Sequence, residues 1–330
     1  MKIVITGGCG FLGLGIARKL IERQEARKAE GLIGKQQEVE SLVLFDAQVP
    51  DELPDGLDDR VSLAAGDISD RGQVTALIDR DDIAVFHLAS VVSAGGEQDF
   101  DLTMRVNFDG GHNVLEVCRA RNSVPKVVFA SSLAVFGGEA LPDAVNDMTR
   151  VTPQTTYGMT KAIGELMIND YTRKGFIDGR AARLPTVIIR PGPPNAAASG
   201  VFREPLAGNE FVLPVGMGTK MMVLGTRNAV AGLIGLMDAD GDALGGDRMV
   251  CLPNNAYSVA EMITALEAVA ADKGISLGPI TPRPDPATET IVTSWPLIMD
   301  DARARALGLP ADESLERVIG DYIEDFGTGQ

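Results

Sequence analysis

The 330-residue sequence has few of the side chains that build disulfides and metal centres. Its three cysteines, Cys9, Cys118 and Cys251, are odd in number and far apart, so neither a disulfide framework nor a cysteine-based zinc site fits them. His87 and His112 are its only histidines, and His87 lies in an apolar run that is typical of a core position. We therefore expect no metal site and a reducing, cytoplasmic compartment.

Long apolar runs and clusters of positive charge are also missing. No apolar run approaches the about 20 residues that span a bilayer, and the residues after Met1 do not have the basic and then apolar pattern of a secretory signal. The 46 acidic residues outnumber the 30 basic ones and give a net charge of −16. Such a chain repels nucleic acid and anionic membranes, so we expect neither as a partner.

The first half of the chain alternates short apolar runs with longer helical patterns, which is typical of a parallel sheet covered on both faces. The expected strands are nearly continuously apolar, as buried strands are, and lie at 2–6, 41–46, 60–64, 83–88, 126–131 and 183–190. Helical patterns occupy 11–23, 71–79, 101–121 and 157–174. We predict an α/β fold, a doubly wound parallel (Rossmann) sheet. The polar segment 24–40 is assigned no function.

A glycine-rich loop joins the first strand to the first helix. It places Gly7, Gly10 and Gly13 where a tight turn, a close backbone approach to a pyrophosphate and close helix packing each require a glycine. Phe11 and Leu12 open the helix, whose N-terminus favours phosphate. The loop predicts a dinucleotide site.

Two acidic residues follow the next two strands. Asp46 can accept both ribose hydroxyls of an adenosine and repel a 2′-phosphate, and no Lys or Arg follows it until Arg60, so NAD is favoured over NADP. Asp46 could instead cap its turn. Asp67 and Ile68 are placed to contact an adenine, although an Asx-turn at Asp67 is an equal alternative.

Tyr157 and Lys161 lie one helical turn apart, on one face of an expected helix. A nearby ammonium favours phenolate over phenol, which makes a tyrosine a general base. Ser132 lies just past a buried strand. By itself such a Tyr/Lys pair is usually a surface contact, and the presence of Ser132 favours a catalytic role instead.

At this point the sequence resembles the extended short-chain dehydrogenase/reductase family. The resemblance rests on the glycine loop, Asp46, Asp67, residues 87–90, Asn107 with Gly110, Ser132, Tyr157 with Lys161, and residues 190–192. It implies that Tyr157 exchanges the substrate proton, that Lys161 holds the nicotinamide ribose and tunes Tyr157, and that Ser132 orients the reacting oxygen.

The same resemblance implies further cofactor contacts and a homodimer. The contacts would come from Leu88, Ala89, Ser90, Asn107 and Pro191. Asn107 could equally be a structural bridge inside its helix. Residues 1–190 would form the NAD-binding domain with the catalytic residues, and 191–330 a smaller, mainly substrate-binding α/β lobe, with some segments returning to the first domain. Dimers would form through the helix that carries Tyr157 and the helix before it.

The substrate is suggested by a departure from the family's nucleotide-sugar members. Met221 and Met222 stand where those members carry an Arg-Asp pair, so the diphosphate anchor is missing. The blocks 190–199, 202–208, 293–296 and 302–308 resemble those of the D-erythronate dehydrogenase group. That resemblance implies NAD-dependent oxidation of the C2 hydroxyl of a four-carbon sugar acid.

Candidate substrate contacts follow from the needs of such an acid. Hydroxyls could bind Ser93 and Ser132, and the carboxylate could bind Arg203, Arg227 or the amides near Asn195, with Arg190 and Lys220 as further cations. A salt bridge to a neighbouring carboxylate is the alternative role for each arginine. Two other functions compete with this one: a nucleotide-diphosphate-sugar epimerase or dehydratase, and a non-catalytic NAD-sensing module.

Overall fold

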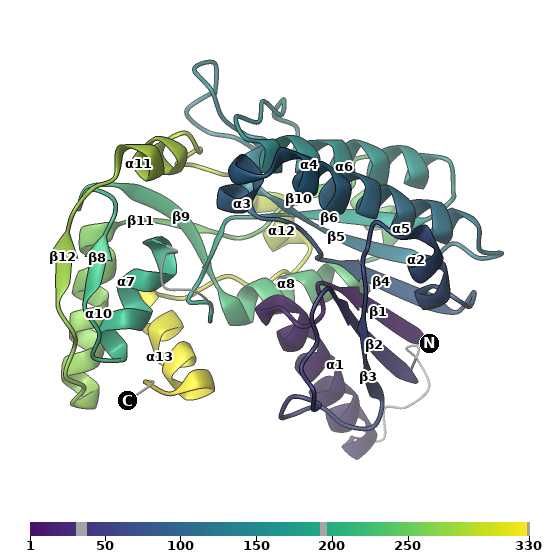
Figure 1. The fold of residues 1–330 in the computed structure, drawn as a ribbon, viewed down its shortest axis with the longest axis horizontal. Coiled ribbons are helices and arrows are strands. Elements are labelled where there is room, and N and C mark those ends of the chain that lie inside the picture. The colour runs from purple at the N-terminus through teal and green to yellow at the C-terminus, as the bar shows by residue number, and fades with distance from the viewer. Residues whose placement is uncertain (31–37, 192–196, 329–330) are drawn as a thin grey trace. The chain divides into compact units, whose positions relative to one another are not determined.

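The computed structural model describes residues 1–30, 38–191 and 197–328. The chain forms two compact units (Figure 1). The first comprises Met1–Val135, Val151–Arg183 and Val230–Val250, and the second comprises Phe136–Arg150, Leu184–Ala229 and Cys251–Gln330. Each unit is therefore built from segments that are separate in the sequence.

A seven-stranded sheet forms the centre of the first unit. Its order is β10(Met249–Cys251), β6(Asp178–Leu184), β5(Lys126–Ser132), β4(Ile83–His87), β1(Lys2–Thr6), β2(Ser41–Asp46) and β3(Val61–Ala65). β1 pairs in parallel with both β2 and β4, and Thr6 lies opposite Phe45 on one side and His87 on the other. This order confirms the predicted doubly wound Rossmann sheet, whose switch point between β1 and β4 is where such sheets bind ligands.

Helices cover both faces of this sheet (Figure 1). α2(Arg71–Leu77), α5(Gly110–Arg119) and α6(Thr156–Arg173) lie over one face, and α1(Phe11–Ala29) and α8(Thr226–Asp238) lie over the other. Val85 and Val127 of the sheet share a core with Val114 of α5 and Ile168 of α6. Burying these branched side chains from water supplies the main driving force for the layered packing.

The chain differs from the sequence prediction where buried charges lie inside a strand. The expected strand at 183–190 is divided into β6(Asp178–Leu184) and β7(Thr186–Ile188). Arg180 is fully buried in β6, where it pairs with Asp178 and donates to the backbone carbonyls of Leu236 and Met237. Because the carbonyls that accept from Arg180 are distant in sequence, no local pattern shows that this charged segment forms an internal strand.

The long helical pattern at 101–121 is also interrupted. It consists of α4(Phe100–Thr103), the π-helical η1(Met104–Asp109) and α5(Gly110–Arg119). A π-helical turn re-aims the side chains that it carries and is often found at functional sites. Here it carries Asn107.

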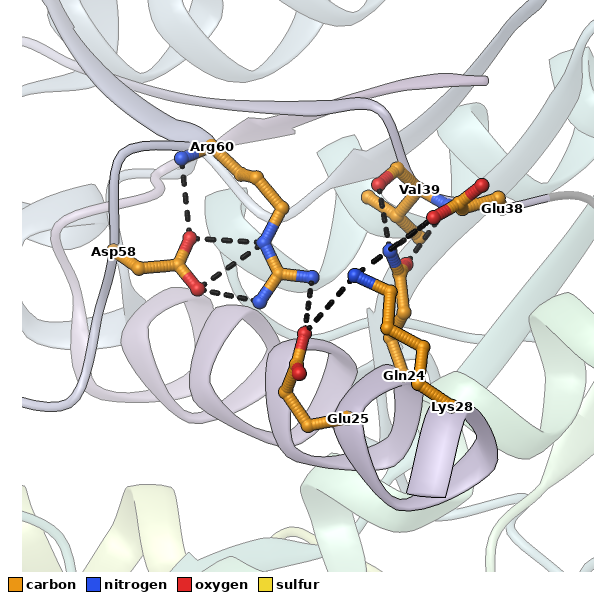
Figure 2. A network of polar contacts seen from close by, with 7 residues as sticks. All are labelled: Gln24, Glu25, Lys28, Glu38, Val39, Asp58 and Arg60. Atoms are coloured by element: carbon orange, nitrogen blue, oxygen red, sulfur yellow. Dashed lines mark hydrogen bonds and ion pairs between the residues drawn. The ribbon is translucent and has the colours of Figure 1, made fainter. Parts of the chain in front are cut away.

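Helix α1 continues beyond the predicted end at residue 23 to Ala29, because polar contacts hold its last turns (Figure 2). Gln24 exchanges two hydrogen bonds with the backbone of Val39. Arg60 pairs with Glu25 of α1 and with Asp58. These contacts join the end of α1 to the segments before β2 and β3. The polar segment 24–40 thus has a structural role.

The second unit has two small sheets. One has the order β11(Asn255–Ser258), β9(Lys220–Gly225), β7(Thr186–Ile188), and the other pairs β12(Ile280–Pro282) with β8(Phe211–Leu213). The helices of this unit include α7(Ala197–Leu206), α10(Val259–Lys273), α11(Pro286–Thr293), α12(Ala302–Ala306) and α13(Leu315–Phe326). An apolar core joins residues such as Ile188, Phe202, Met221, Leu266 and Ile319. Among the described residues of the chain, no helix is both long and apolar enough to cross a membrane.

Candidate active site

The glycine loop after β1 has no room for side chains at three positions. Gly7 has a φ of +67°, and a Cβ there would lie 2.8 Å from the backbone nitrogen of Ala89. A Cβ on Gly8 would lie 2.6 Å from the Ile5 carbonyl oxygen, and one on Gly13 would lie 2.5 Å from the Gly8 carbonyl oxygen. Gly8, which belongs to the same glycine-rich run, is a further position where the loop requires glycine and was not among those expected from the motif spacing.

Helix α1 starts directly from this loop. Gly10 is its N-cap and offers no side-chain cap, so the first turn presents backbone amides. A loop whose shape excludes side chains, followed by an uncapped helix N-terminus, fits the pyrophosphate of a dinucleotide.

Asp46 ends β2 beside this loop. Its Oδ2 accepts the Cys9 amide at 3.1 Å, and its Oδ1 accepts the Ala47 amide at 2.8 Å, so the carboxylate both faces the loop and caps its own turn. Arg60, the first cation after Asp46, is paired with Asp58 and Glu25 (Figure 2). The site therefore presents the carboxylate of Asp46, a group that can accept hydrogen bonds from a ribose diol. Arg60 is bound to carboxylates and so is not placed to bind a 2′-phosphate.

Asp67 forms an Asx-turn in the structure. Its Oδ1 accepts the Ser69 hydroxyl at 2.7 Å and the Ser69 amide at 2.9 Å, and these bonds hold the pKa of Asp67 below its usual value. Ile68 is buried and packs closely on Gly110 of α5. The geometry shows the structural role of both residues, and an adenine contact remains a prediction.

The end of β4 lies against the same loop. The Leu88 amide donates to the Thr6 carbonyl at 3.0 Å, and the Ala89 amide lies 3.3 Å from the Thr6 hydroxyl. That hydroxyl is also 2.7 Å from Nδ1 of His87, whose pKa is lowered to about 3 by burial and, secondarily, by the charge of Lys161. His87 is thus a neutral core residue that holds the strand end in place.

Asn107 connects this strand end to helix α6. Its Oδ1 accepts the Val91 amide at 2.7 Å, and its Nδ2 donates to the Val91 carbonyl at 3.0 Å and to the Thr160 hydroxyl at 3.1 Å. Thr160 in turn donates to the Tyr157 carbonyl at 2.8 Å. These contacts make Asn107 the structural bridge that was one of its two expected roles. Ser90 donates to the Val91 carbonyl in the same segment.

Tyr157 and Lys161 occupy successive turns of α6. The Lys161 nitrogen lies 5.5 Å from the centre of the Tyr157 ring and 4.9 Å from that of Phe129 in β5. Lys161 is only 3% exposed, and burial lowers its pKa to about 7. The Lys161 nitrogen thus lies near the ring of a partly exposed phenol, where a positive charge favours phenolate over phenol.

Ser132 ends β5, which packs against α6. Its Oγ accepts the Ala134 amide at 3.1 Å. A Cβ on Gly158 would lie 2.1 Å from the Ala134 carbonyl oxygen, so α6 begins in direct contact with the turn η2(Leu133–Val135) that follows Ser132. The structure thus brings Ser132 and the start of the Tyr157 helix together within the first unit.

Residues that the sequence analysis missed hold the N-terminus of α6. Thr155 caps the helix by accepting the Gly158 amide at 3.0 Å, and Glu97 accepts the Thr156 amide at 2.8 Å. Glu97 belongs to α3(Ser93–Gln98), where Gly96 lies so close that a Cβ would be 3.4 Å from that of Tyr157. Ser93 begins this short helix and is half-buried. The capping pattern at Thr155 was detectable in the sequence, but the contact with Glu97 required the fold.

The remaining predicted contacts belong to the second unit. Arg203 pairs with Glu204 and donates to the Arg190 carbonyl at 3.0 Å. Arg227 pairs with Asp321, Glu324 and Asp325, which raise its pKa. Pro191 precedes a gap in the described residues, and Asn195 lies outside them.

A comparison with protein families gives one match, to the model described as "3-beta hydroxysteroid dehydrogenase/isomerase family", over residues 4–195. The chain belongs to this family. The match confirms the resemblance to the extended short-chain dehydrogenase/reductase family that the sequence motifs indicated. This family and the full-length relatives described next, which are named dehydrogenases, make the chain an oxidoreductase whose cofactor is NAD.

Several proteins are similar over the full length of the chain. The D-erythronate dehydrogenase of Cupriavidus necator is 45% identical over 100% of both chains, and that of Haemophilus influenzae is 38% identical over 98% of this chain and 99% of its own. Among solved structures, one described as a nucleoside-diphosphate-sugar epimerase from Agrobacterium tumefaciens has a TM-score of 0.85 and 38% identity, and covers 100% of this chain and 95% of its own.

Proposed function

We propose that this oxidoreductase oxidises the C2 hydroxyl of a four-carbon sugar acid, converting D-erythronate to 2-dehydro-D-erythronate with NAD. The observation that carries the proposal is the 45% identity, over the whole of both chains, with the Cupriavidus necator enzyme of that name. The pair of Tyr157 and Lys161 on α6 supports the chemistry.

In this proposal Tyr157 is the general base that takes the proton of the C2 hydroxyl. Lys161, 5.5 Å from the Tyr157 ring, favours the phenolate by its positive charge. Ser132 hydrogen-bonds the reacting oxygen, and its place at the end of β5, beside the start of α6, supports that role.

Most of the proposed cofactor residues follow the ends of strands β1 to β4. Gly7, Gly10, Phe11, Leu12 and Gly13 would hold the pyrophosphate, with Asp46 on the adenosine ribose, Asp67 and Ile68 near the adenine, and Leu88, Ala89, Ser90 and Pro191 along the nicotinamide half. Bound NAD supplies the acceptor for the hydride that leaves C2. Asn107 acts through Val91 and Thr160, which it holds in place.

For the substrate, we propose hydroxyl contacts from serines and give less weight to the two arginines as carboxylate anchors. Ser93 and Ser132 would bind hydroxyls. Arg203 and Arg227 each have carboxylate partners within the second unit, which supports the salt-bridge alternative for both. Asn195 remains a candidate from the sequence alone.

A nucleotide-diphosphate-sugar epimerase is the second candidate, because the similar Agrobacterium tumefaciens structure carries that description. Met221 and Met222 weigh against it. Both are buried in β9, at 4% and 2% exposure, where the nucleotide-sugar pattern would place a charged pair. Buried thioethers provide no anchor for a diphosphate.

The test is to follow NADH formation at 340 nm with the purified protein and a panel of four- to six-carbon aldonates, each with NAD and with NADP. UDP- and GDP-sugars are incubated in parallel and their products are separated by chromatography, because epimerisation and dehydration form no net NADH. We expect turnover of D-erythronate with NAD and little with NADP. Conversion of a nucleotide sugar without oxidation of any aldonate would overturn the proposal.

We also propose, from the family resemblance, a homodimer formed through α5 and α6. Leu166 on α6 is 66% exposed, which supports a partner on that face. Cytoplasmic localisation remains a prediction from the sequence.

A further inference from the structure

A third functional group lies on the same face of α6 as Tyr157 and Lys161. Glu165 follows Lys161 by one helical turn, just as Lys161 follows Tyr157, so the three side chains form one row along the helix. Glu165 is buried, with 3% exposure. A buried carboxylate beside a buried ammonium would be expected to pair with it, yet Glu165 pairs with a different cation.

That cation is Arg183, from β6. Its Nε donates to Oε1 of Glu165 at 2.9 Å and its Nη2 donates to Oε2 at 2.7 Å, a bidentate pair in which both side chains are 4% exposed. Ser131 of β5 donates a further bond to Oε1 at 2.6 Å. Ser131 directly precedes Ser132, so the network joins the strand of Ser132 to the helix of Tyr157.

Among the described groups packed against α6, Glu165 and Arg183 form the buried charged pair beside Tyr157 and Lys161. The other charged groups there are exposed, paired elsewhere or neutral. His87 of β4 is neutral above about pH 3. Glu97 of α3 is exposed and bonded to the Thr156 amide, and Glu116 of α5 pairs with Arg119. The remaining charged or titratable groups on α4, η1 and the start of α5 are exposed: Asp101, Arg105, Asp109 and His112.

We propose that Glu165 and Arg183 are positioning residues that set the pH at which Tyr157 and Lys161 act. Arg183 neutralises the carboxylate next to Lys161, so that the ammonium acts on the phenol of Tyr157 instead of on Glu165. The proposal rests on the function proposed above, because it takes Tyr157 as the base. A buried ion pair adds little net stability compared with apolar side chains, which favours a functional reason for its place.

Opposite effects follow for the two single variants. Arg183→Gln leaves a negative charge near the row, which disfavours phenolate, so the acid limb of the kcat/KM profile should move to higher pH. Glu165→Gln leaves a positive charge, so the limb should move to lower pH. At an effective dielectric constant of about 20 and a separation of about 6–10 Å, each shift should be about 1–2 pH units. The double variant Glu165→Gln with Arg183→Gln should return close to the wild-type profile.

The experiment measures kcat/KM against pH for D-erythronate oxidation by these three variants and by Arg183→Lys, which keeps the charge and should restore the wild-type limb. Arg173→Gln is the control, since it breaks an exposed ion pair on the same helix, and it should not move the limb. Circular dichroism and NADH binding verify that each variant is folded.

The ionisation of Tyr157 is read separately from the difference in phenolate absorbance near 295 nm between each variant and the same variant carrying Tyr157→Phe. Opposite shifts that cancel in the double variant support the proposal. Equal shifts, or no shift, in folded single variants overturn it. The absorbance measurement needs no substrate. It therefore still tests the effect of Glu165 and Arg183 on Tyr157 if D-erythronate is not turned over, a result that would contradict only the proposed function.

Discussion

Lys161 is a side chain that is costly to bury and that we propose takes part in the chemistry. It is 3% exposed, and its nitrogen lies over the rings of Phe129 and Tyr157. Burial disfavours the ammonium, so its pKa falls to about 7, while the same absence of water strengthens its effect on the phenol beside it. We therefore expect substitutions here and at Tyr157 to separate stability from activity.

Tyr157→Phe should lower kcat by about 10²- to 10⁴-fold, because the general base is lost. Binding of NADH, followed by its fluorescence, should be retained. Tyr171→Phe is the matched control, since Tyr171 lies on the same helix and donates to Glu116 at 2.6 Å. If Tyr157→Phe turned over at the wild-type rate, the proton-transfer role would have to be abandoned.

Lys161→Met should change the pH dependence of stability in the cofactor-free protein. The pKa of Lys161 is lowered from 10.5 to about 7, so between these values the unfolded state binds more protons than the folded state. Wild-type stability should therefore rise with pH across this window and be lowest below pH 7, relative to the variant.

The difference in slope should reach about 1.4 kcal/mol per pH unit at most, because one proton is involved. Urea unfolding at pH values from 6 to 9 measures it. Lys19→Met, at an exposed lysine of α1, should follow the wild type. Parallel curves for wild type and Lys161→Met would contradict the assignment.

At the scale of elements, the site is made by the ends of β1, β2, β4 and β5 and by one face of α6. The glycine loop, Asp46 and the Tyr157–Lys161 spacing were detectable because each is local in the chain. The role of Asn107 was left open, since its partners Val91 and Thr160 are distant in sequence. Strand β6 was missed at its start because Arg180 is buried there and donates to the carbonyls of Leu236 and Met237, which no local pattern shows.

Gly13→Ala should disrupt the contact between α1 and the glycine loop, because the new Cβ would lie 2.5 Å from the Gly8 carbonyl oxygen. We expect a loss of about 1–3 kcal/mol in unfolding free energy and weaker NAD binding, measured by urea unfolding and by calorimetry. Gly320→Ala is the matched helical control, since nothing lies within 4 Å of its added Cβ, and it should gain about 0.5–1 kcal/mol. Unchanged NAD affinity in Gly13→Ala would refute the close-packing role.

At the scale of the whole molecule, the net charge of −16 describes the surface rather than the site. An acidic protein can bind an anionic cofactor where backbone amides and a helix N-terminus set the local field. The chain passes several times between its two units, since Val230–Val250 belongs to the first unit and Phe136–Arg150 to the second.

The proposed homodimer predicts that Leu166→Glu yields monomers. Leu166 is 66% exposed on α6, and a charge placed in an apolar interface would oppose association. Sedimentation velocity of the wild type and the variant measures the effect, with Val124→Glu, at a 55% exposed position outside the helices, as the control. A monomeric wild type, or a Leu166→Glu variant that remains dimeric, would contradict this interface.

The sequence by itself determined the Rossmann class, the dinucleotide loop and the pairing of Tyr157 with Lys161, because these depend on local periodicity and spacing. Only the tertiary structure showed that Asn107 bridges Val91 to Thr160, that Arg203 and Arg227 are bound to carboxylates, and that Arg183 pairs with Glu165, one helical turn from Lys161. The physical reason is that whether a polar or charged side chain acts on a ligand or on its neighbours depends on the groups that folding brings around it, and those groups come from distant parts of the chain.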